Sequence, residues 1–176
     1  MMKIAFAGEM TSGKTTAAEY LSEVYGFGIL SFADKLKYNL IDIGVPIKVL
    51  FEEKTEASRT LMQVYGEVMR DYDPEYWVDY ILEGVSTGEG MLTEAHAVDD
   101  MRYLNEGEVL KEEGFHLVCI TKKGPAPMWS PTHEHASENE WRDIDFDYHI
   151  SAQEGDLVDL FGQLDDMIAD IIKNGD

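Results

Sequence analysis

Residues 8–15 read Gly8-Glu9-Met10-Thr11-Ser12-Gly13-Lys14-Thr15 and match the pattern G-x-x-x-x-G-K-[ST] at every fixed position. A short β-like apolar run, residues 3–7, precedes the stretch, and a helical pattern over residues 14–25 follows it. Glycines let the backbone curl so that successive N–H groups point at one anion, and the helix adds its positive N-terminal end. The stretch therefore predicts a phosphate-binding loop between a strand and a helix.

The side chains of this loop have different expected roles. Lys14 is expected to reach the β- and γ-phosphates of a nucleoside triphosphate, and the hydroxyl of Thr15 to ligate Mg²⁺. The other loop residues expected to hold the phosphates are Gly8, Met10, Thr11, Ser12, Gly13 and Thr16. The alternative is a glycine-rich turn that only joins two elements, which the strand and helix on either side of the motif disfavour.

The rest of the chain alternates between β-like and helical patterns. Further strands are expected at residues 28–32, 95–98, 115–121 and 146–150. Helical patterns cover residues 33–43, 55–82 with a break at Asp73-Pro74, 104–113, and a last segment from about residue 157. Because strands and helices alternate, we expect a parallel sheet and an α/β fold.

We expect one domain over residues 1–176, since a chain of 176 residues with 44% hydrophobic content can bury a single core. A helical region, about 33–88, is inserted between the second and third strands. Over residues 122–142 the periodicity fails among prolines, histidines and tryptophans, and we predict a lid there. Ser151 and Glu154 have the spacing of a capping box ahead of the last helix.

The charge balance narrows the range of partners. The chain carries 35 acidic and 14 basic residues, a formal net charge of −21, which repels DNA, RNA and anionic lipid. It contains no run of about 18 apolar residues of the kind that crosses a membrane. We therefore expect a soluble, cytoplasmic protein whose partners are small molecules, with neither a nucleic-acid polymer nor a membrane among them; a homodimer is left open. The single cysteine, Cys119, lies in an apolar run and is interpreted as core packing.

Two of the four arginines share one helical stripe. An α-helix turns by 100° per residue, which places four residues within about 60° of one another on one side of the helix: Arg59, Gln63, Gly66 and Arg70. A guanidinium matches phosphate oxygens with two N–H groups, and the glycine leaves room for a ligand to lie close. The stripe is thus a candidate site for the phosphate of an acceptor. The alternative is a solvated helix face whose arginines pair with neighbouring acids.

Two adjacent carboxylates, Asp99 and Asp100, follow the third predicted strand. Ligands of open α/β folds collect at this end of the sheet, and a carboxylate there can hold the Mg²⁺ shell. Both are therefore candidate metal residues. The alternative is a strand-end turn that caps a helix. Asp34, after the second strand, has the same two interpretations.

Several segments in this order resemble a known family, the bacteriophage-type deoxynucleoside monophosphate kinases, which belong to the adenylate kinase-like P-loop nucleotide kinases. The similar segments are the phosphate loop, Phe32-Ala33-Asp34 with Leu36-Lys37, Arg59 to Gln63-x-x-Gly66 with Arg70, Asp73-Pro74-x-x-Trp77-Val78, Asp99-Asp100-Met101-Arg102-x-x-Asn105-Glu106, His135-x-Ser137-Glu138 and Asp147-Tyr148-x-Ile150. Many families share the loop alone, whereas D-D-x-R-x-x-N-E and H-x-S-E are much narrower patterns.

The resemblance implies a three-layer P-loop NTPase fold with a five-stranded parallel sheet, a helical acceptor-binding region and a mobile lid. It implies transfer of the γ-phosphoryl group of ATP to a deoxynucleoside monophosphate with the help of Mg²⁺, in the host cytoplasm if the chain comes from a phage. The acceptor-binding residues that it implies are Asp34, Arg59, Gln63, Gly66, Arg70, Trp77 and Arg102. The catalytic residues would be Lys14, Arg70, Arg102 and Arg142, and the donor base would lie against Gln153.

Departures from the family pattern leave base selectivity and lid chemistry open. The chain has Gly66-Glu67-Val68 where the family often has Gly-Thr-Glu. After the fourth strand it has Thr121-Lys122-Lys123 where the family has an arginine. The amide that the family has near the last strand, next to the donor base, corresponds to Gln153 only if one residue is inserted. Two other functions stay possible. One is a related small-molecule kinase, such as a dephospho-coenzyme A kinase, in which Asp34 would act as the base toward a ribose hydroxyl. The other is a nucleotide-binding module without catalysis.

Overall fold

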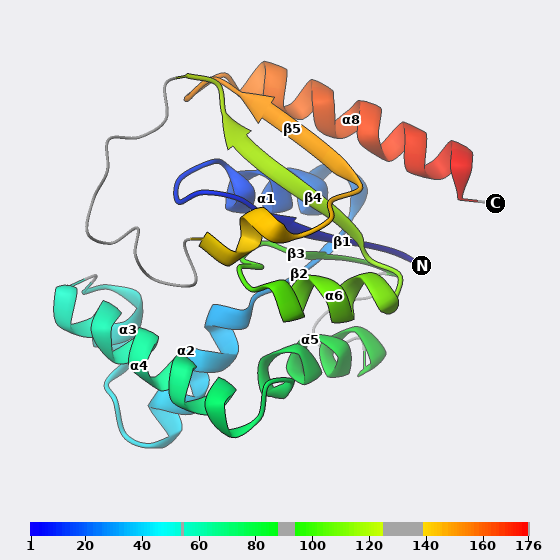
Figure 1. Cartoon of the computed structure of the whole chain (residues 1–176). Helices are drawn as coiled ribbons and strands as arrows, with labels where there is room; N and C mark the ends of the chain where they lie inside the picture. Colours follow the sequence, from blue (N-terminus) through cyan, green and yellow to red (C-terminus); the bar gives the residue numbers. More distant parts are fainter. Residues whose placement is uncertain (54, 88–93, 125–138, 176) are drawn as a thin grey trace.

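A parallel sheet of five strands forms the centre of the fold (Figure 1). The computed structural model describes residues 1–53, 55–87, 94–124 and 139–175. The strands are β1 (Met2–Ala7), β2 (Gly28–Leu30), β3 (Ala95–Val98), β4 (His116–Lys122) and β5 (Tyr148–Ala152). They lie in the order β2-β3-β1-β4-β5, and every neighbouring pair is parallel. The predicted α/β class and five-stranded parallel sheet are confirmed.

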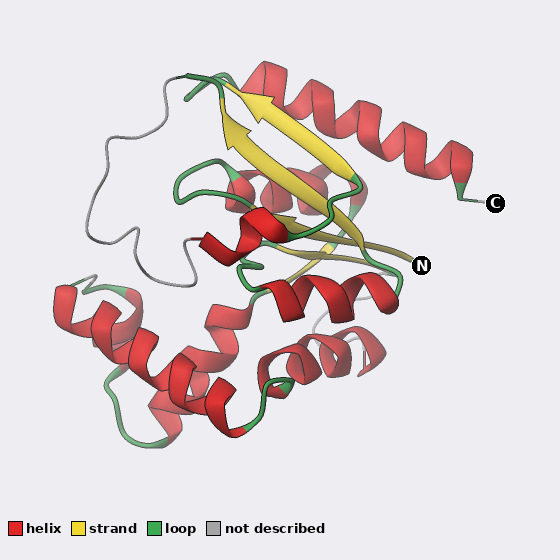
Figure 2. Cartoon of the chain, in the orientation of Figure 1, coloured by secondary structure: helices red, strands yellow, loops and turns green. Residues whose placement is uncertain are grey.

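Helices cover both faces of the sheet, which makes three layers (Figure 2). The helices against one face are α1 (Lys14–Tyr25) and α8 (Leu157–Asn174), and those against the other include α5 (Tyr76–Thr87), α6 (Leu104–Glu112) and the 3₁₀ helix η2 (Glu140–Asp143). Because successive strand residues point to opposite faces, Phe6 joins the core under α1 and α8, whereas Ala5 and Ala7 join the other core. Cys119 is buried in that second core, so the packing role predicted for it is confirmed.

A group of helices follows β2 and precedes β3, in the part of the chain where the helical region was predicted (Figure 1). Its members are α2 (Phe32–Asp42), α3 (Ile47–Phe51), α4 (Glu56–Tyr72) and α5. The predicted break lies between α4 and α5, where Asp73 is extended (φ −147°, ψ 105°) as a residue before proline prefers. Its carboxylate accepts a hydrogen bond from the N–H of Glu75 at 3.1 Å, which turns the chain into α5.

The structure shifts the predicted end of the second strand. β2 ends at Leu30, and Phe32, which we expected in the strand, already begins α2. The cause is a carboxylate from elsewhere in the chain: Asp100 accepts from the N–H groups of Phe32 (2.9 Å) and Ala33 (2.8 Å). These are N–H groups that a helix start leaves without a helical partner, so Asp100 stabilises the start of α2.

The last strand begins later than expected, whereas the last helix, α8, begins at Leu157 as predicted. β5 covers residues 148–152 instead of 146–150. The cap of α8 is Asp156, whose carboxylate accepts from the N–H of Asp159 at 3.1 Å, so the capping box predicted at Ser151 and Glu154 was wrong.

Two further predictions concern the lid and the absence of a membrane-spanning segment. Of the predicted lid, 122–142, residues 125–138 lie outside the described residues, and with them the His135-x-Ser137-Glu138 segment. None of the helices in the described ranges is both long and apolar enough to cross a membrane.

Candidate active site

The predicted phosphate loop lies between β1 and α1, and its glycines have structural reasons to be there. Gly8 has φ +140°, and a Cβ at this position would lie 2.1 Å from the carbonyl oxygen of Ile120 in β4. Gly13 and Thr11 also have positive φ values, 103° and 61°. These conformations curl the loop over the start of α1, where the first N–H groups lack a helical acceptor. The segment therefore has the curled backbone that anion binding requires.

Lys14 is buried at this loop, with 8% of its surface exposed. Its Nζ donates hydrogen bonds to the carbonyl oxygens of Gly8 (2.9 Å) and Glu9 (2.7 Å), so the ammonium group lies within the curve of the loop. A buried ammonium group is costly unless it is hydrogen-bonded. Phosphate oxygens would be stronger acceptors for it than neutral carbonyls, because they carry charge.

A hydroxyl and a carboxylate meet at the first turn of α1. Thr15 Oγ1 donates to Asp99 Oδ2 at 2.9 Å, and Asp99 Oδ1 is buried without a hydrogen-bond partner in the described part of the chain. Burial, and then the neighbouring charge of Asp100, raise the pKa of Asp99 to about 6, although the Thr15 hydroxyl opposes the shift. A hydroxyl beside an unsatisfied carboxylate oxygen is a donor set that Mg²⁺ accepts, since this ion binds through few protein oxygens and keeps several waters. The two side chains therefore fit a magnesium ion.

The raised pKa of Asp99 predicts a pH-dependent stability in metal-free protein. Between about pH 4 and pH 6 the folded state keeps a proton on Asp99 that the unfolded state has lost, so the free energy of unfolding falls as pH rises through this window. A shift of about two pKa units limits the decrease in the free energy of unfolding to about 3 kcal/mol. Solvent screening reduces the expected decrease to about 1–2 kcal/mol. Asp99→Asn should therefore be more stable than wild type at pH 7.

Urea unfolding at pH 4.5 and pH 7, with a chelator present, measures this difference. Asp42→Asn on the exposed side of α2 is the matched control and should keep the wild-type pH dependence. Equal pH dependence in wild type and Asp99→Asn would contradict the expectation.

Asp100 does not join Asp99, although both were candidate metal residues. Besides the two α2 amides, its carboxylate accepts from Ser31 Oγ at 2.8 Å, so both of its oxygens are engaged at the helix start. The helix-capping interpretation therefore describes Asp100, and only Thr15 and Asp99 are carried forward as candidate metal residues. Within the described ranges, no group of three or more His, Cys, Asp or Glu side chains is arranged to hold a metal ion.

A cavity of about 370 Å³ lies between α4, the start of α2 and the segment after β3. Six of the seven predicted acceptor residues line it, namely Arg59, Gln63, Gly66, Arg70, Trp77 and Arg102. Met10 of the phosphate loop also lines it, so the cavity adjoins the loop. The seventh residue, Asp34, is not part of the lining and instead forms an ion pair with Lys37 at 3.0 Å.

The floor of this cavity is built around Gly66. Trp77 is 2% exposed, and its Nε1 donates to the carbonyl oxygen of Gly66 at 3.2 Å, which ties α5 to α4. A Cβ on Gly66 would lie 3.3 Å from Leu36 Cδ1 and 3.4 Å from Arg70 Nη1. The glycine therefore leaves the Arg70 guanidinium and the apolar wall undisturbed.

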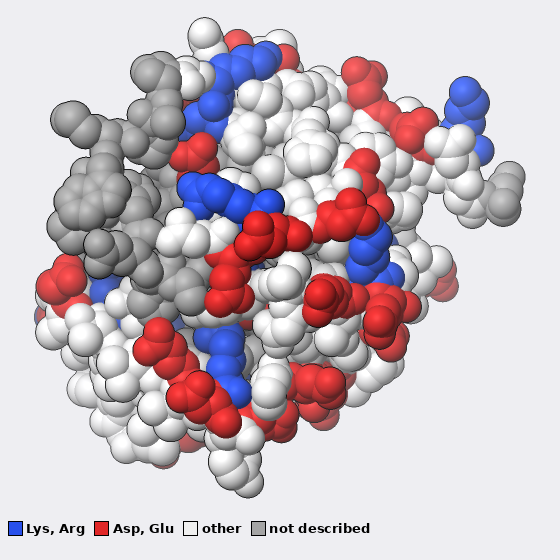
Figure 3. All heavy atoms as spheres, in the orientation of Figure 1, with Lys and Arg blue, Asp and Glu red and all other residues white. Residues whose placement is uncertain are grey.

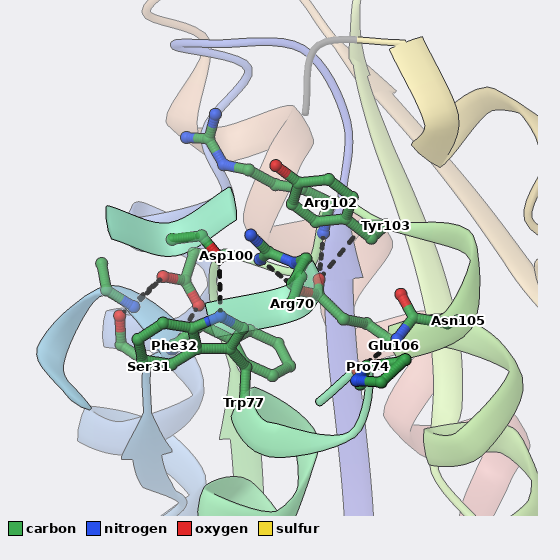
Figure 4. A network of polar contacts seen from close by, with 12 residues as sticks. Ser31, Phe32, Arg70, Pro74, Trp77, Asp100, Arg102, Tyr103, Asn105 and Glu106 are labelled. Carbon is green, nitrogen blue, oxygen red and sulfur yellow. Dashed lines mark hydrogen bonds and ion pairs between the residues drawn. The ribbon is translucent and has the colours of Figure 1, made fainter. Parts of the chain in front are cut away.

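Arg70 is held in place by two residues of the segment after β3 (Figure 4). Its Nη2 donates to Glu106 Oε1 at 2.9 Å, and its guanidinium carbon lies 3.6 Å from the centre of the Tyr103 ring. Burial raises the pKa of Glu106, while the Arg70 charge opposes that rise. The sequence motifs contained Glu106 and Phe32, but neither was given a role, and Tyr103 was overlooked; all three line the same cavity. The tyrosine directly after Arg102 and the glutamate four residues after it were the available signal.

Two further predicted residues lie outside this cavity. Arg142, in η2, is stacked on the Trp141 ring at 4.5 Å and donates to Asn139 Oδ1 at 3.1 Å. Gln153 is exposed in the turn after β5. The structure therefore does not place either side chain beside Arg70. The role predicted for Arg142 belongs to the lid, and the role predicted for Gln153 belongs to the donor base.

The charged side chains of the chain are mostly acidic. On the face shown in Figure 3, Asp and Glu side chains surround the few Lys and Arg side chains. Lys122 pairs with Glu154 at 3.3 Å and Lys123 with Asp159 at 2.7 Å, so even these two lysines are partly neutralised. Three of the four arginines, Arg59, Arg70 and Arg102, line the cavity, together with three carboxylates, Glu56, Asp100 and Glu106.

Comparison with solved structures first places the fold. The dephospho-CoA kinase from Campylobacter jejuni has a TM-score of 0.52 at 17% identity, covering 97% of this chain and 98% of that one. A gluconokinase from Sinorhizobium meliloti 1021 has a TM-score of 0.51 at 15% identity, with 98% and 94% coverage. The shikimate kinase from Aquifex aeolicus has a TM-score of 0.50 at 17% identity, covering 99% of this chain and 98% of that one. The fold is thus that of the small-molecule P-loop kinases.

Sequence comparison then identifies the family. A protein of Acanthamoeba polyphaga mimivirus named "Putative deoxynucleotide monophosphate kinase" is 30% identical over 171 residues, which cover 82% of this chain and 84% of the viral protein. "Uncharacterized protein ORF76" of Ictalurid herpesvirus 1 (strain Auburn) is 27% identical over 158 residues, covering 85% of this chain and 58% of that protein. No model of a protein family matches the chain. The chain belongs to the deoxynucleotide monophosphate kinase family, and it is a phosphotransferase of the nucleotide kinase class.

Proposed function

We propose that this enzyme transfers the γ-phosphoryl group of ATP to a deoxynucleoside monophosphate and so forms the diphosphate. One observation carries the proposal: the cavity that adjoins the phosphate loop at Met10 is lined by three arginines and by aromatic side chains. A volume of about 370 Å³ is within the range of small-molecule sites. The arginines suit a phosphate, and the rings of Phe32, Trp77 and Tyr103 suit a base and a sugar. The mimivirus relative bears the name of this activity.

A phosphate acceptor fits the arginines that the site contains. Such an acceptor is already anionic at neutral pH, so catalysis needs positioning and charge neutralisation, and no general base. Arg59, Arg70 and Arg102 would hold the acceptor, and Lys14 would stabilise charge on the transferring group. A hydroxyl acceptor would need a base, and the candidate, Asp34, is paired with Lys37 outside the cavity lining.

The donor side of the proposal rests on the phosphate loop. The loop amides and Lys14 would bind the ATP phosphates, with Thr15 and Asp99 holding Mg²⁺. When bound, this ion would neutralise negative charge on the ATP phosphates. Gln153 would lie near the donor base, and residues 122–142 would close as a lid that brings Arg142 closer and excludes water.

A screen of acceptors tests the proposal. ADP release is measured with each ribo- and deoxynucleoside monophosphate, and with dephospho-coenzyme A as the hydroxyl acceptor. We expect kcat/KM for at least one deoxynucleoside monophosphate to exceed that for dephospho-coenzyme A by at least about tenfold, a difference of about 1.4 kcal/mol. Preference for the hydroxyl acceptor, with dependence on Asp34, would replace the proposal by its first alternative. ATP binding without product on any acceptor would indicate a nucleotide-binding module.

A further inference from the structure

Glu106 is an unusual carboxylate in a highly acidic chain. Of the acidic residues in the described ranges, it alone is buried, with 1% of its surface exposed. A buried carboxylate is unfavourable unless it is paired and hydrogen-bonded. The groups that compensate its burial therefore indicate why it lies there.

Three donors point at the two oxygens of Glu106. Oε1 accepts from Arg70 Nη2 at 2.9 Å, and Oε2 accepts from the backbone N–H groups of Arg102 (2.8 Å) and Tyr103 (3.1 Å). Tyr103 is the residue before α6, so the second oxygen also caps this helix. One carboxylate thus joins the acceptor helix α4 to the segment that carries Arg102 (Figure 4).

Tyr103 completes the arrangement from the other side of Arg70. Its ring lies 3.6 Å from the guanidinium carbon, while Glu106 binds one edge of the same group. An arginine side chain has many rotamers, and holding it in one of them before a ligand arrives lowers the entropy lost on binding. A guanidinium carries five N–H donors, so the bond through Nη2 leaves it able to bind a phosphate.

We propose that Glu106 is a positioning residue for the acceptor phosphate. Through Arg70 and through the backbone of Arg102, it sets the two arginines relative to each other before the acceptor binds. The inference rests on the proposed function, because it requires an anionic acceptor in the cavity that these arginines line. Glu106 acts on the acceptor through these residues and takes no part in the transfer itself.

The substitution Glu106→Gln tests this role with almost no change of shape. The amide nitrogen of glutamine cannot accept a hydrogen bond, so at least one of the three donors loses its acceptor, and Arg70 loses its counter-charge. We expect kcat/KM for the acceptor to fall about 10- to 100-fold, mainly through a higher acceptor KM. The KM for ATP should stay within about twofold, since Lys14 is held by the carbonyl oxygens of its own loop and Thr15 by Asp99.

A double-mutant cycle separates positioning from a purely structural role. If Glu106 acts mainly through Arg70, Glu106→Gln in an Arg70→Ala background should lower acceptor kcat/KM by no more than about threefold further. A general loss of structure would lower activity equally in both backgrounds and would raise the KM for ATP as well. Glu108→Gln, an exposed carboxylate on the same helix, is the matched control and should behave as wild type.

Each outcome of the experiment has one meaning. If the wild-type enzyme phosphorylates no deoxynucleoside monophosphate, the proposed function fails. If the wild type is active and Glu106→Gln keeps the wild-type acceptor KM, or the two variants are additive, the positioning role is overturned. Should Glu106→Gln not fold, Glu106→Asp replaces it, because the shorter carboxylate keeps its charge but cannot reach all three donors at once. An unchanged acceptor KM in that variant overturns the role equally.

Discussion

Replacing Lys14 with alanine will lower kcat by about a thousandfold while the protein remains folded. The Nζ of Lys14 lies within the phosphate loop, bonded to the carbonyl oxygens of Gly8 and Glu9. In a site with little water, a preorganised positive group stabilises the charge that develops on the transferring phosphoryl group, and one such donor contributes roughly a hundred- to a thousandfold in rate. Alanine leaves no group that could replace it.

The fold should tolerate this change because the Lys14 ammonium group donates hydrogen bonds to two carbonyls of its own loop. Removing a buried charge also removes its desolvation cost. Steady-state ADP release gives kcat, and thermal unfolding gives the stability. Lys48→Ala, which removes an exposed lysine paired with Glu53, serves as the control. Normal turnover by the Lys14 variant would remove the loop from the mechanism.

The second large effect is expected on the acceptor side. Arg70→Ala should lower kcat/KM for the acceptor by about a hundred- to a thousandfold, because a charge-assisted, two-pronged contact to phosphate is lost. The KM for ATP should change little, since Arg70 lines the acceptor cavity and not the phosphate loop. Steady-state kinetics with each substrate varied in turn measure both constants. Wild-type acceptor kinetics would argue against the arginine stripe.

Arg70→Ala also has a predictable cost in stability. It leaves the Glu106 carboxylate buried without its counter-charge, which costs about 3–5 kcal/mol in comparable buried pairs unless the group takes up a proton. Kinetics should therefore be measured well below the unfolding temperature of the variant. Arg70→Lys keeps the charge but not the planar fork, so it should recover stability more fully than acceptor binding.

Local patterns predicted the parts of the site that are local in the chain. The loop between residues 8 and 15 depends on its own glycines, so its motif was enough to place it after a strand and before a helix. The same holds for the stripe of Arg59 and Arg70, since both lie on one helix and their spacing decides that they face the same cavity. Helical and strand periodicity therefore carried these predictions.

Contacts between distant segments account for what the sequence alone did not reveal. The end of β2 depends on Asp100, which lies 68 residues after Phe32 and caps α2. The orientation of Arg70 depends on Glu106, 36 residues away. No periodicity connects such pairs, and the two interpretations of Asp100 could be separated only once its hydrogen-bond partners were known.

The acidic charge balance also affects how the substrates reach this enzyme. ATP and a nucleotide acceptor are both anions, so at a distance the field of a chain with a net charge of −21 opposes their approach. Attraction therefore depends on short-range contacts with Lys14 and the arginines that line the cavity. At about 0.1 M salt the Debye length is about 10 Å, which limits the repulsion to the immediate surroundings of the protein. Dissolved counterions therefore affect the rate of association. A nucleotide already complexed with a divalent cation carries less negative charge and is repelled less.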